Sequence, residues 1–458
     1  MLTYDLKKSP GVPLYEALYR CIRADILSGN LLAGQKLPSK RALAANLEVS
    51  KITVETAYGQ LLAEGYISAR EKVGYFVEAV ERVHKAAAPS EMPPEEPKET
   101  FAVDLTVSGP TQFPFSVWSR LQRNVMLDYG EKLLRPLPNQ GFYGLRRAIA
   151  HHLSAFRGMA VAPENILIGA GTDFLYNLLI QLLGRDKRYA VEDPGYGKIR
   201  KIYAAGGAEC VDAPMDECGV IPAALEAAQV LHISPSHHFP TGLVTPPARR
   251  LELLSWAAKG DRWIIEDDYD SEFRFDAHPM SAMQSLDRHG RVIYMNTFSK
   301  SLAPSIRISY MVLPPALMAQ FREKLGFYSC TVPSFEQYTL ERFLSEGHFE
   351  KHINRMRKAY KNRRNRLVEM LKSSPIADQI TILEQDAGLH FLLRIDTNMA
   401  DGELTAHWAA AGIRIRALSE YYHGDTPADD RRCLVVDYSG LTEENLAELE
   451  KRLKRLER

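Results

Sequence analysis

The chain has 458 residues, which is more than one ordinary domain holds, so we expect two or three domains. Its composition is 45% hydrophobic and 25% charged, and its formal net charge is zero, which excludes binding of nucleic acid through overall charge alone. No apolar run is long enough to span a membrane, and the N-terminus lacks the apolar stretch of a signal peptide. We therefore expect a cytoplasmic protein that does not bind membranes.

Three short helices and a hairpin are predicted at the start of the chain. Apolar residues at helical spacing predict a first helix over 13–27. Ser39 and Ser50 are suitable N-caps for a second and a third helix. Residues 66–77 then form two strands around a tip at Lys72. This order is typical of a winged helix-turn-helix domain.

The third helix would be the recognition helix of such a domain. Its first turn carries short polar and basic groups, which suit phosphates and base edges. The candidate DNA-binding residues are Arg41, Ser50, Lys51, Thr53 and Lys72. A small helical domain used for protein contacts is the alternative.

Residues 13–67 closely resemble the GntR-family DNA-binding domain. The matching pieces include Leu-Pro-Ser at 37–39, Val-Ser at 49–50 and Glu-Gly-Tyr-Ile at 64–67. The resemblance implies that the partner is a double-stranded DNA operator. Lys51 stands where the family usually has arginine, and lysine makes no bidentate contact with guanine. A phosphate contact and a base contact are therefore both open for Lys51.

Residues 78–100 predict a linker between two domains. They contain four prolines, many charges and almost no large apolar side chain, which is typical of a semi-extended tether without a core. We therefore expect a DNA-binding domain at 1–77 and a large domain at 101–458. The last part of the large domain, from about residue 320 to 458, would form a smaller subdomain.

Two apolar strands of the large domain end in polar residues that suit a cofactor. One strand runs into the carboxylates of the segment WIIEDDYDSEF at 263–273, and the other, in RVIYMNTFSK at 291–300, ends near Lys300. A desolvated lysine can lose its proton and condense with an aldehyde. A lysine, a carboxylate and a phenol facing one pocket suit pyridoxal 5′-phosphate (PLP), whose ring nitrogen is held protonated by the carboxylate.

These two segments resemble the fold-type I aminotransferases, and more narrowly the PLP-containing MocR/GabR-type regulators. The resemblance implies Lys300 as the Schiff-base lysine, Asp267 as the partner of the ring nitrogen and Tyr269 as the phenol beside the ring hydroxyl. Asp268 and Asp270 are alternatives for the carboxylate. The implied fold class is α/β, with a mixed, mainly parallel sheet and a smaller α/β C-terminal subdomain.

A glycine turn between an apolar strand and a helix predicts the phosphate site. Residues 166–172 have this form, and free amides at a helix N-terminus bind phosphate. The candidate phosphate-binding residues are Gly171, Thr172, Ser299 and Arg307. In the resembling family a tyrosine lies beside the cofactor ring, and Tyr196 matches it.

The residues that would hold the carboxylate of an effector are less well defined. Lys198, two positions after Tyr196, is one candidate, with solvent exposure as the alternative. In aminotransferases an arginine clamps the substrate α-carboxylate, and its place here is near 432–436. Arg432, Arg414 and Arg416 are all candidates for this arginine.

Residues 234–242, SPSHHFPTG, resemble the MocR-type form of the aminotransferase Asn-Pro-Thr-Gly turn. Catalytic aminotransferases usually have asparagine before that proline, to bond the ring hydroxyl, whereas this chain has Phe239. The change argues against full transaminase efficiency. Neither His237–His238 nor the pair His348 and His352 has a third ligand at convincing spacing, so no metal site is predicted.

Together these domains predict a PLP-dependent, DNA-binding transcriptional regulator. The large domain would sense an amine, an amino acid or PLP itself, and would shift between two states that differ in DNA affinity. The resemblance implies a homodimer with a head-to-tail arrangement. A genuine class I/II aminotransferase with a DNA-binding appendage is the alternative, and a cofactor-free dimerisation scaffold is a third reading. We expect weak transaminase half-reactions at most.

Overall fold

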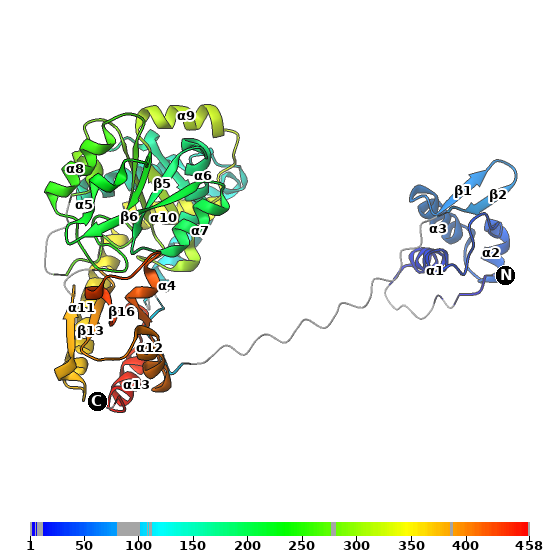
Figure 1. The fold of residues 1–458 in the computed structure, drawn as a ribbon. Coiled ribbons are helices and arrows are strands. Elements are labelled where there is room, and N and C mark those ends of the chain that lie inside the picture. The colour runs from blue at the N-terminus through cyan, green and yellow to red at the C-terminus, as the bar shows by residue number, and fades with distance from the viewer. Residues whose placement is uncertain are drawn as a thin grey trace. The chain divides into compact units, whose positions relative to one another are not determined.

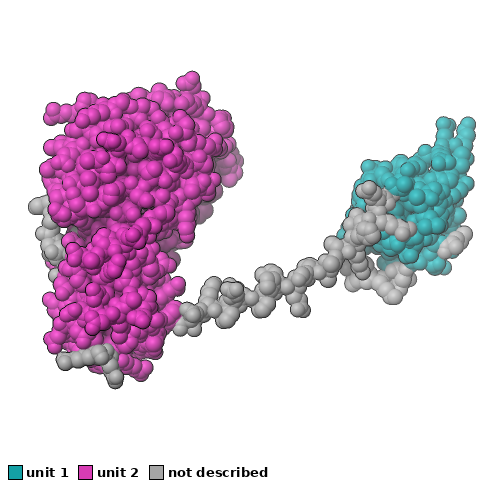
Figure 2. All heavy atoms as spheres, viewed as in Figure 1, with its two compact units in different colours: residues 1–99 teal, residues 100–458 magenta. Residues whose placement is uncertain are grey.

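The computed structural model divides the chain into two compact units, Met1–Glu99 and Thr100–Arg458, which Figure 2 shows in teal and magenta. The predicted linker at 78–100 lies outside the described residues from residue 80 onward. Among the helices that are described, none is long and apolar enough to cross a membrane. The structure describes residues 2–4, 6, 12–79, 101–107, 109, 112–275, 281–384 and 388–456.

The first unit is a winged helix-turn-helix, as predicted. Its helices pack through Leu18, Ile22, Val54 and Tyr58, all of which are fully buried. Both predicted N-caps are confirmed, because the side chains of Ser39 and Ser50 accept hydrogen bonds from backbone amides of the helices that follow them. The elements are α1 (Leu14–Ser28), α2 (Lys40–Asn46), α3 (Lys51–Ala63) and the antiparallel strands β1 (Ile67–Arg70) and β2 (Gly74–Val77).

The second unit is built on an eight-stranded sheet in the order β4-β11-β10-β9-β8-β5-β6-β7. Strands β10, β9, β8, β5 and β6 are parallel, whereas β11 is antiparallel to both of its neighbours. This confirms the predicted mixed, mainly parallel sheet. The strands are β4 (Ile166–Gly169), β5 (Arg188–Asp193), β6 (Glu209–Asp216), β7 (Gly219–Val220), β8 (Val230–Ile233), β9 (Trp263–Asp267), β10 (Val292–Thr297) and β11 (Ser309–Val312).

Helices cover both faces of this sheet (Figure 1) because successive strand residues point to opposite faces. In β4, Leu167 packs in the cluster of α6, α7 and α9, whereas Ile166 and Ile168 pack in the cluster of α5, α10 and α11. The helices of this unit up to residue 372 are α4 (Phe115–Tyr129), α5 (Tyr143–Arg157), α6 (Thr172–Leu183), α7 (Gly197–Ala205), α8 (Pro247–Ala257), α9 (Pro315–Leu325), α10 (Ser334–Ser345) and α11 (His348–Lys372).

A smaller α/β part follows α11 and completes the predicted fold class. Its four-stranded sheet has the order β12-β13-β16-β15 and is antiparallel throughout. The short strand β3 (Val103–Asp104), from the start of the unit, pairs with β14 (Ile413–Arg414). The remaining elements are β12 (Ile380–Leu383), β13 (His390–Ile395), α12 (Asp401–Ala410), β15 (Arg416–Ala417), β16 (Cys433–Asp437) and α13 (Glu443–Leu453).

Candidate functional site

The carboxyl ends of β9 and β10 bring the predicted cofactor residues together. The two strands are parallel, with Asp267 opposite Met295, so the residues that follow each strand emerge at the same edge of the sheet. Tyr269 follows β9. Lys300 follows β10, and burial, followed by the charges of His237, His238 and Lys300, lowers the pKa of His390 on β13. A lysine, a carboxylate and a phenol therefore meet at this edge.

Asp267 has one carboxylate oxygen that no described residue satisfies. Its Oδ2 accepts a hydrogen bond from the hydroxyl of Tyr176 and lies 3.4 Å from Nε2 of His232. Its Oδ1 is buried and has no hydrogen-bond partner in the described part of the chain, and the residue is only 5% exposed. A buried acceptor of this kind needs a donor. The protonated ring nitrogen of PLP is a suitable one, so this side chain fits the cofactor.

The two alternative carboxylates have other partners. Asp268 lies 2.9 Å from Nε of the buried Arg157 and accepts a hydrogen bond of 2.6 Å from the hydroxyl of Tyr294. Asp270 lies 2.8 Å from Nδ1 of His237. Asp268 also has a buried Oδ1 without a hydrogen-bond partner among the described residues, but its other oxygen already faces the guanidinium of Arg157. Since Asp270 is paired with His237, these ion pairs favour Asp267 for the ring nitrogen.

The turn before α6 forms a cradle that suits a phosphate. Gly171 has φ +87°, and a Cβ at this position would lie 2.3 Å from Nη2 of Arg307. Only glycine lets the guanidinium lie against this turn. Thr172 begins α6, whose first amides have no partner within the helix. The Ser299 amide donates a hydrogen bond of 3.2 Å to Oγ1 of Thr297, which fixes the backbone just after β10.

Tyr196 and Lys198 lie at the start of α7 and are partly open to solvent. The Tyr196 ring is 50% exposed, meets the Phe239 ring edge-on at 6.0 Å and lines a pocket together with His232 and Tyr421. Lys198 donates to Oδ2 of Asp173 over 2.7 Å. Since Arg307 contacts the same oxygen at 3.4 Å, Lys198 lies next to the phosphate cradle.

The structure does not bring Arg432 to this pocket. Arg432 precedes β16, and the pairing of β16 with β13 puts His390 beside the other end of that strand. Its guanidinium donates to the carbonyl of Thr397 over 2.5 Å. Arg414 instead lies 3.5 Å from Asp104.

Arg416 is the third candidate, and it comes nearest to the pocket. Burial raises the pKa of Tyr421, which lines the pocket beside Tyr196, and the charge of the neighbouring Arg416 partly offsets this rise. Of the three arginines that the sequence suggested, Arg416 is therefore the one placed beside a residue of the pocket wall.

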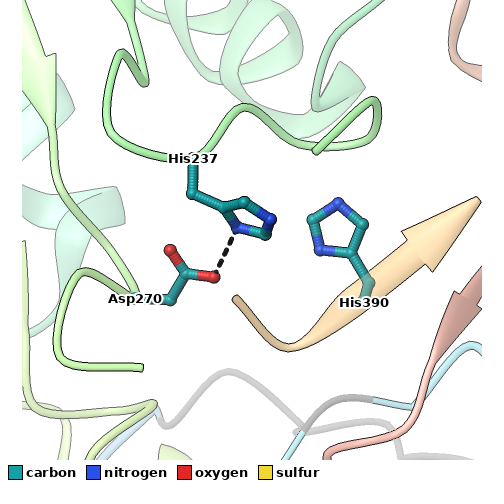
Figure 3. Close-up of side chains that lie close together, drawn as sticks. All are labelled: His237, Asp270 and His390. Atoms are coloured by element: carbon teal, nitrogen blue, oxygen red, sulfur yellow. Dashed lines mark hydrogen bonds and ion pairs between the residues drawn. The ribbon is translucent and has the colours of Figure 1, made fainter. Parts of the chain in front are cut away.

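Two histidines that the sequence analysis did not assign to the cofactor also lie here (Figure 3). His237 and His390 have ring centroids 4.6 Å apart, and both are almost completely buried. Burial, followed by the proximity of His237, lowers the pKa of His390 well below its usual value, so this ring is neutral. With Asp270 they place three possible metal-ligating atoms within 4.8 Å of one another. Sequence spacing missed this group because its members come from three segments that are far apart in the chain: after β8, after β9 and at the start of β13.

The predicted DNA-binding residues are on the surface of the first unit. Arg41 on α2, Lys51 in the first turn of α3 and Lys72 in the turn between β1 and β2 are all exposed. The hydroxyls of Ser50 and Thr53 lie 2.9 Å apart, and the Thr53 amide donates to Ser50. These two residues therefore also stabilise the start of α3.

Comparisons with known proteins assign both units to families. The family "Bacterial regulatory proteins, gntR family" matches residues 14–77, and "Aminotransferase class I and II" matches residues 103–453. In solved structures, the chain is similar to the kynurenine aminotransferase of Pyrococcus horikoshii in complex with PMP, with a TM-score of 0.67 and 25% identity over 78% of this chain and 91% of that one.

Two curated relatives align with this chain over nearly the whole length of both proteins. The chain is 36% identical to the uncharacterized HTH-type transcriptional regulator YdeL of Bacillus subtilis, over 99% of this chain and 98% of YdeL. It is 33% identical to the probable rhizopine catabolism regulatory protein MocR of Rhizobium meliloti, over 97% of this chain and 93% of MocR. The chain therefore belongs to the MocR-type transcriptional regulators, in which a gntR-type helix-turn-helix domain is joined to an aminotransferase class I and II domain.

Proposed function

We propose that this regulator holds PLP at Lys300 and that the state of the PLP site sets the affinity of the gntR-type domain for operator DNA. The observation that carries the proposal is the buried Oδ1 of Asp267, which has no partner among the described residues and lies at the same sheet edge as Lys300. When bound, PLP supplies an aldehyde for the lysine amine and a ring that draws electrons.

Three residues of the pocket would each contact a different part of the cofactor ring. Asp267 would keep the ring nitrogen protonated, and Tyr269 would donate to the ring hydroxyl. Burial, followed by the charge of Asp270, raises the pKa of Tyr269 well above its usual value, so the phenol keeps the proton that it donates. Tyr196 would cover the ring.

The phosphate of PLP would lie in the cradle before α6. The amides of Gly171 and Thr172 face it as the N-terminus of a helix, which attracts anions. Ser299 would add a hydroxyl and Arg307 a charge-assisted hydrogen bond.

The effector would enter beside the phosphate cradle. Lys198, which is half exposed next to that cradle, would hold a carboxylate of an amino-acid effector. Of the three arginines that the sequence analysis left open, Arg416 would hold the α-carboxylate, because its charge acts on Tyr421 in the pocket wall.

A homodimer is part of the proposal. On the second unit, Phe115 is 75% exposed, Leu127 76% and Leu134 75%, all in α4 and the turn after it. Large apolar side chains that gather on a surface favour an interface between subunits. A head-to-tail dimer would cover them and carry two DNA-binding domains for paired half-sites.

Phe239 favours a sensor over an enzyme. Its ring packs against Tyr196, His390 and Tyr421, so no amide reaches the ring hydroxyl from this position. The competing function is a genuine aminotransferase, which the complete set of lysine, carboxylate and phenol would permit.

The test is an absorption spectrum of the full-length protein with PLP, beside the variant Lys300→Ala, repeated with a panel of amines and amino acids. We expect a visible band in the wild-type protein only. DNA duplexes that the PLP-loaded protein selects from a random pool then serve as the operator. A ligand that changes the absorption band should also change the affinity of the protein for these duplexes. Steady formation of keto acid would favour the enzyme, and no band in the wild-type protein would refute the PLP proposal.

A further inference from the structure

The imidazole of His237 is fixed between two side chains that follow β9. Its Nδ1 lies 2.8 Å from Oδ2 of Asp270 and 3.3 Å from the hydroxyl of Tyr269 (Figure 3 shows the first contact). His237 is 4% exposed and Asp270 is 2% exposed. The backbone before β13 closes over the ring, since a Cβ on Gly388 would lie 1.8 Å from Cε1 of His237. The ring therefore has little freedom to turn.

The two contacts decide which nitrogen of His237 carries the hydrogen. An ionised carboxylate only accepts hydrogen bonds, so the short contact with Asp270 requires a hydrogen on Nδ1. The opposite nitrogen, Nε2, is buried and has no hydrogen-bond partner among the described residues, as expected for a bare lone pair. Asp270 thus holds His237 in one tautomer, in the way that a carboxylate orients an imidazole in other sites.

This tautomer has a consequence for Tyr269. Because Nδ1 already carries a hydrogen that points to Asp270, it cannot accept the hydrogen of the phenol. The hydroxyl of Tyr269 must then donate elsewhere. With the opposite tautomer, Nδ1 would offer a lone pair 3.3 Å from that hydroxyl and would compete for its hydrogen.

We propose that Asp270 and His237 are positioning residues that reserve the hydroxyl hydrogen of Tyr269 for the ring hydroxyl of PLP. The pair would compensate for Phe239, which stands where catalytic aminotransferases usually have the asparagine that bonds the same ring oxygen. The inference rests on the proposed function, because it needs PLP in this pocket, but it concerns residues that the cofactor set of Lys300, Asp267 and Tyr269 does not include.

The experiment compares the affinities of two ligands, PLP and its analogue 3-deoxypyridoxal 5′-phosphate, which lacks the ring hydroxyl. Both are titrated into full-length protein carrying Lys300→Ala, so that no covalent bond contributes. One hydrogen bond to the ring oxygen should make PLP bind about tenfold more tightly than the analogue. Adding Tyr269→Phe should reduce this ratio to about 1.

Adding Asp270→Leu instead should also reduce the ratio to about 1, since Nδ1 of His237 can then turn a lone pair toward the hydroxyl of Tyr269. His237→Asn should preserve the ratio, because its amide N–H still donates to Asp270 and its nitrogen has no lone pair for the phenol. His152→Gln is the matched control, a buried histidine beside Glu350 and outside the pocket, and it should leave the ratio unchanged.

The outcomes separate this inference from the proposed function. If no variant binds PLP, the proposed cofactor fails. If Tyr269→Phe removes the tenfold preference but Asp270→Leu weakens both ligands equally, Asp270 is only structural and the inference is overturned. A long-range ¹H–¹⁵N spectrum of the cofactor-free protein needs no variant: hydrogen on Nδ1 of His237 supports the inference, and hydrogen on Nε2 refutes it.

Discussion

The substitution Gly171→Ala tests the phosphate cradle most directly. The new Cβ would lie 2.3 Å from Nη2 of Arg307, so the guanidinium must move by about 1 Å to restore an ordinary contact. That movement removes a charge-assisted hydrogen bond to the cofactor phosphate, worth about 1.5–3 kcal/mol. We therefore expect PLP to bind roughly 10- to 150-fold more weakly, as measured by titration of the visible absorption band.

Gly260→Ala is the matched control for this prediction. Gly260 also has a positive φ, +86° against the +87° of Gly171, but a Cβ there meets no atom of a described residue within 4 Å. Each alanine also costs unfolding free energy through the backbone alone. The cost is about 1–2 kcal/mol for the positive φ of Gly260 and about 1–3 kcal/mol for Gly171, whose φ of 87° with ψ 163° is essentially confined to glycine. Only Gly171→Ala should weaken PLP, and neither should weaken pyridoxal, which has no phosphate. Wild-type affinity for PLP in Gly171→Ala would refute the cradle.

Three further substitutions test other parts of the structure. Ser50→Ala removes the N-cap of α3 and should cost about 1 kcal/mol, seen as earlier thermal unfolding of the first unit together with weaker DNA binding; unchanged unfolding would show that Ser50 does not act as a cap. Asp268→Asn deprives the buried Arg157 of its carboxylate partner at 2.9 Å and should cost about 3–5 kcal/mol in urea unfolding, whereas a loss below 1 kcal/mol would contradict a buried ion pair. Glu266→Gln tests the pH dependence of stability. Burial raises the pKa of Glu266 from 4.5 to about 7, so the folded state binds more protons than the unfolded state between these two values. The free energy of unfolding therefore falls as the pH rises from 4.5 to about 7. The variant should flatten this fall, and an unchanged slope would assign it to another group.

The cofactor residues could be predicted because their signal is local. Asp267 and Lys300 each come shortly after an apolar run, and parallel strands place such residues at one edge without any knowledge of the rest of the fold. The caps Ser39 and Ser50 were predicted for the same reason, since a capping side chain acts within three residues of itself.

The residues that the sequence analysis missed depend on contacts between distant segments. His237 follows β8, Asp270 follows β9 and His390 begins β13, so their meeting is decided by the packing of two sheets. The sequence also left Arg432, Arg414 and Arg416 open as the arginine for an effector carboxylate. A motif near 432–436 does not reveal which end of β16 faces the pocket, and the antiparallel register with β13 puts Arg432 at the far end.

Asp173 serves two cations at once, Lys198 at 2.7 Å and Arg307 at 3.4 Å. A phosphate that draws Arg307 toward itself leaves the whole negative charge of Asp173 to Lys198 and tightens that ion pair. Lys198 is then harder to recruit for a second anion, so the two anion positions oppose each other. Thermodynamic reciprocity requires the same penalty in both directions. Because Asp173 is shared by both cations, the occupancy of each anion position would depend on the concentrations of both the cofactor and the acidic ligand.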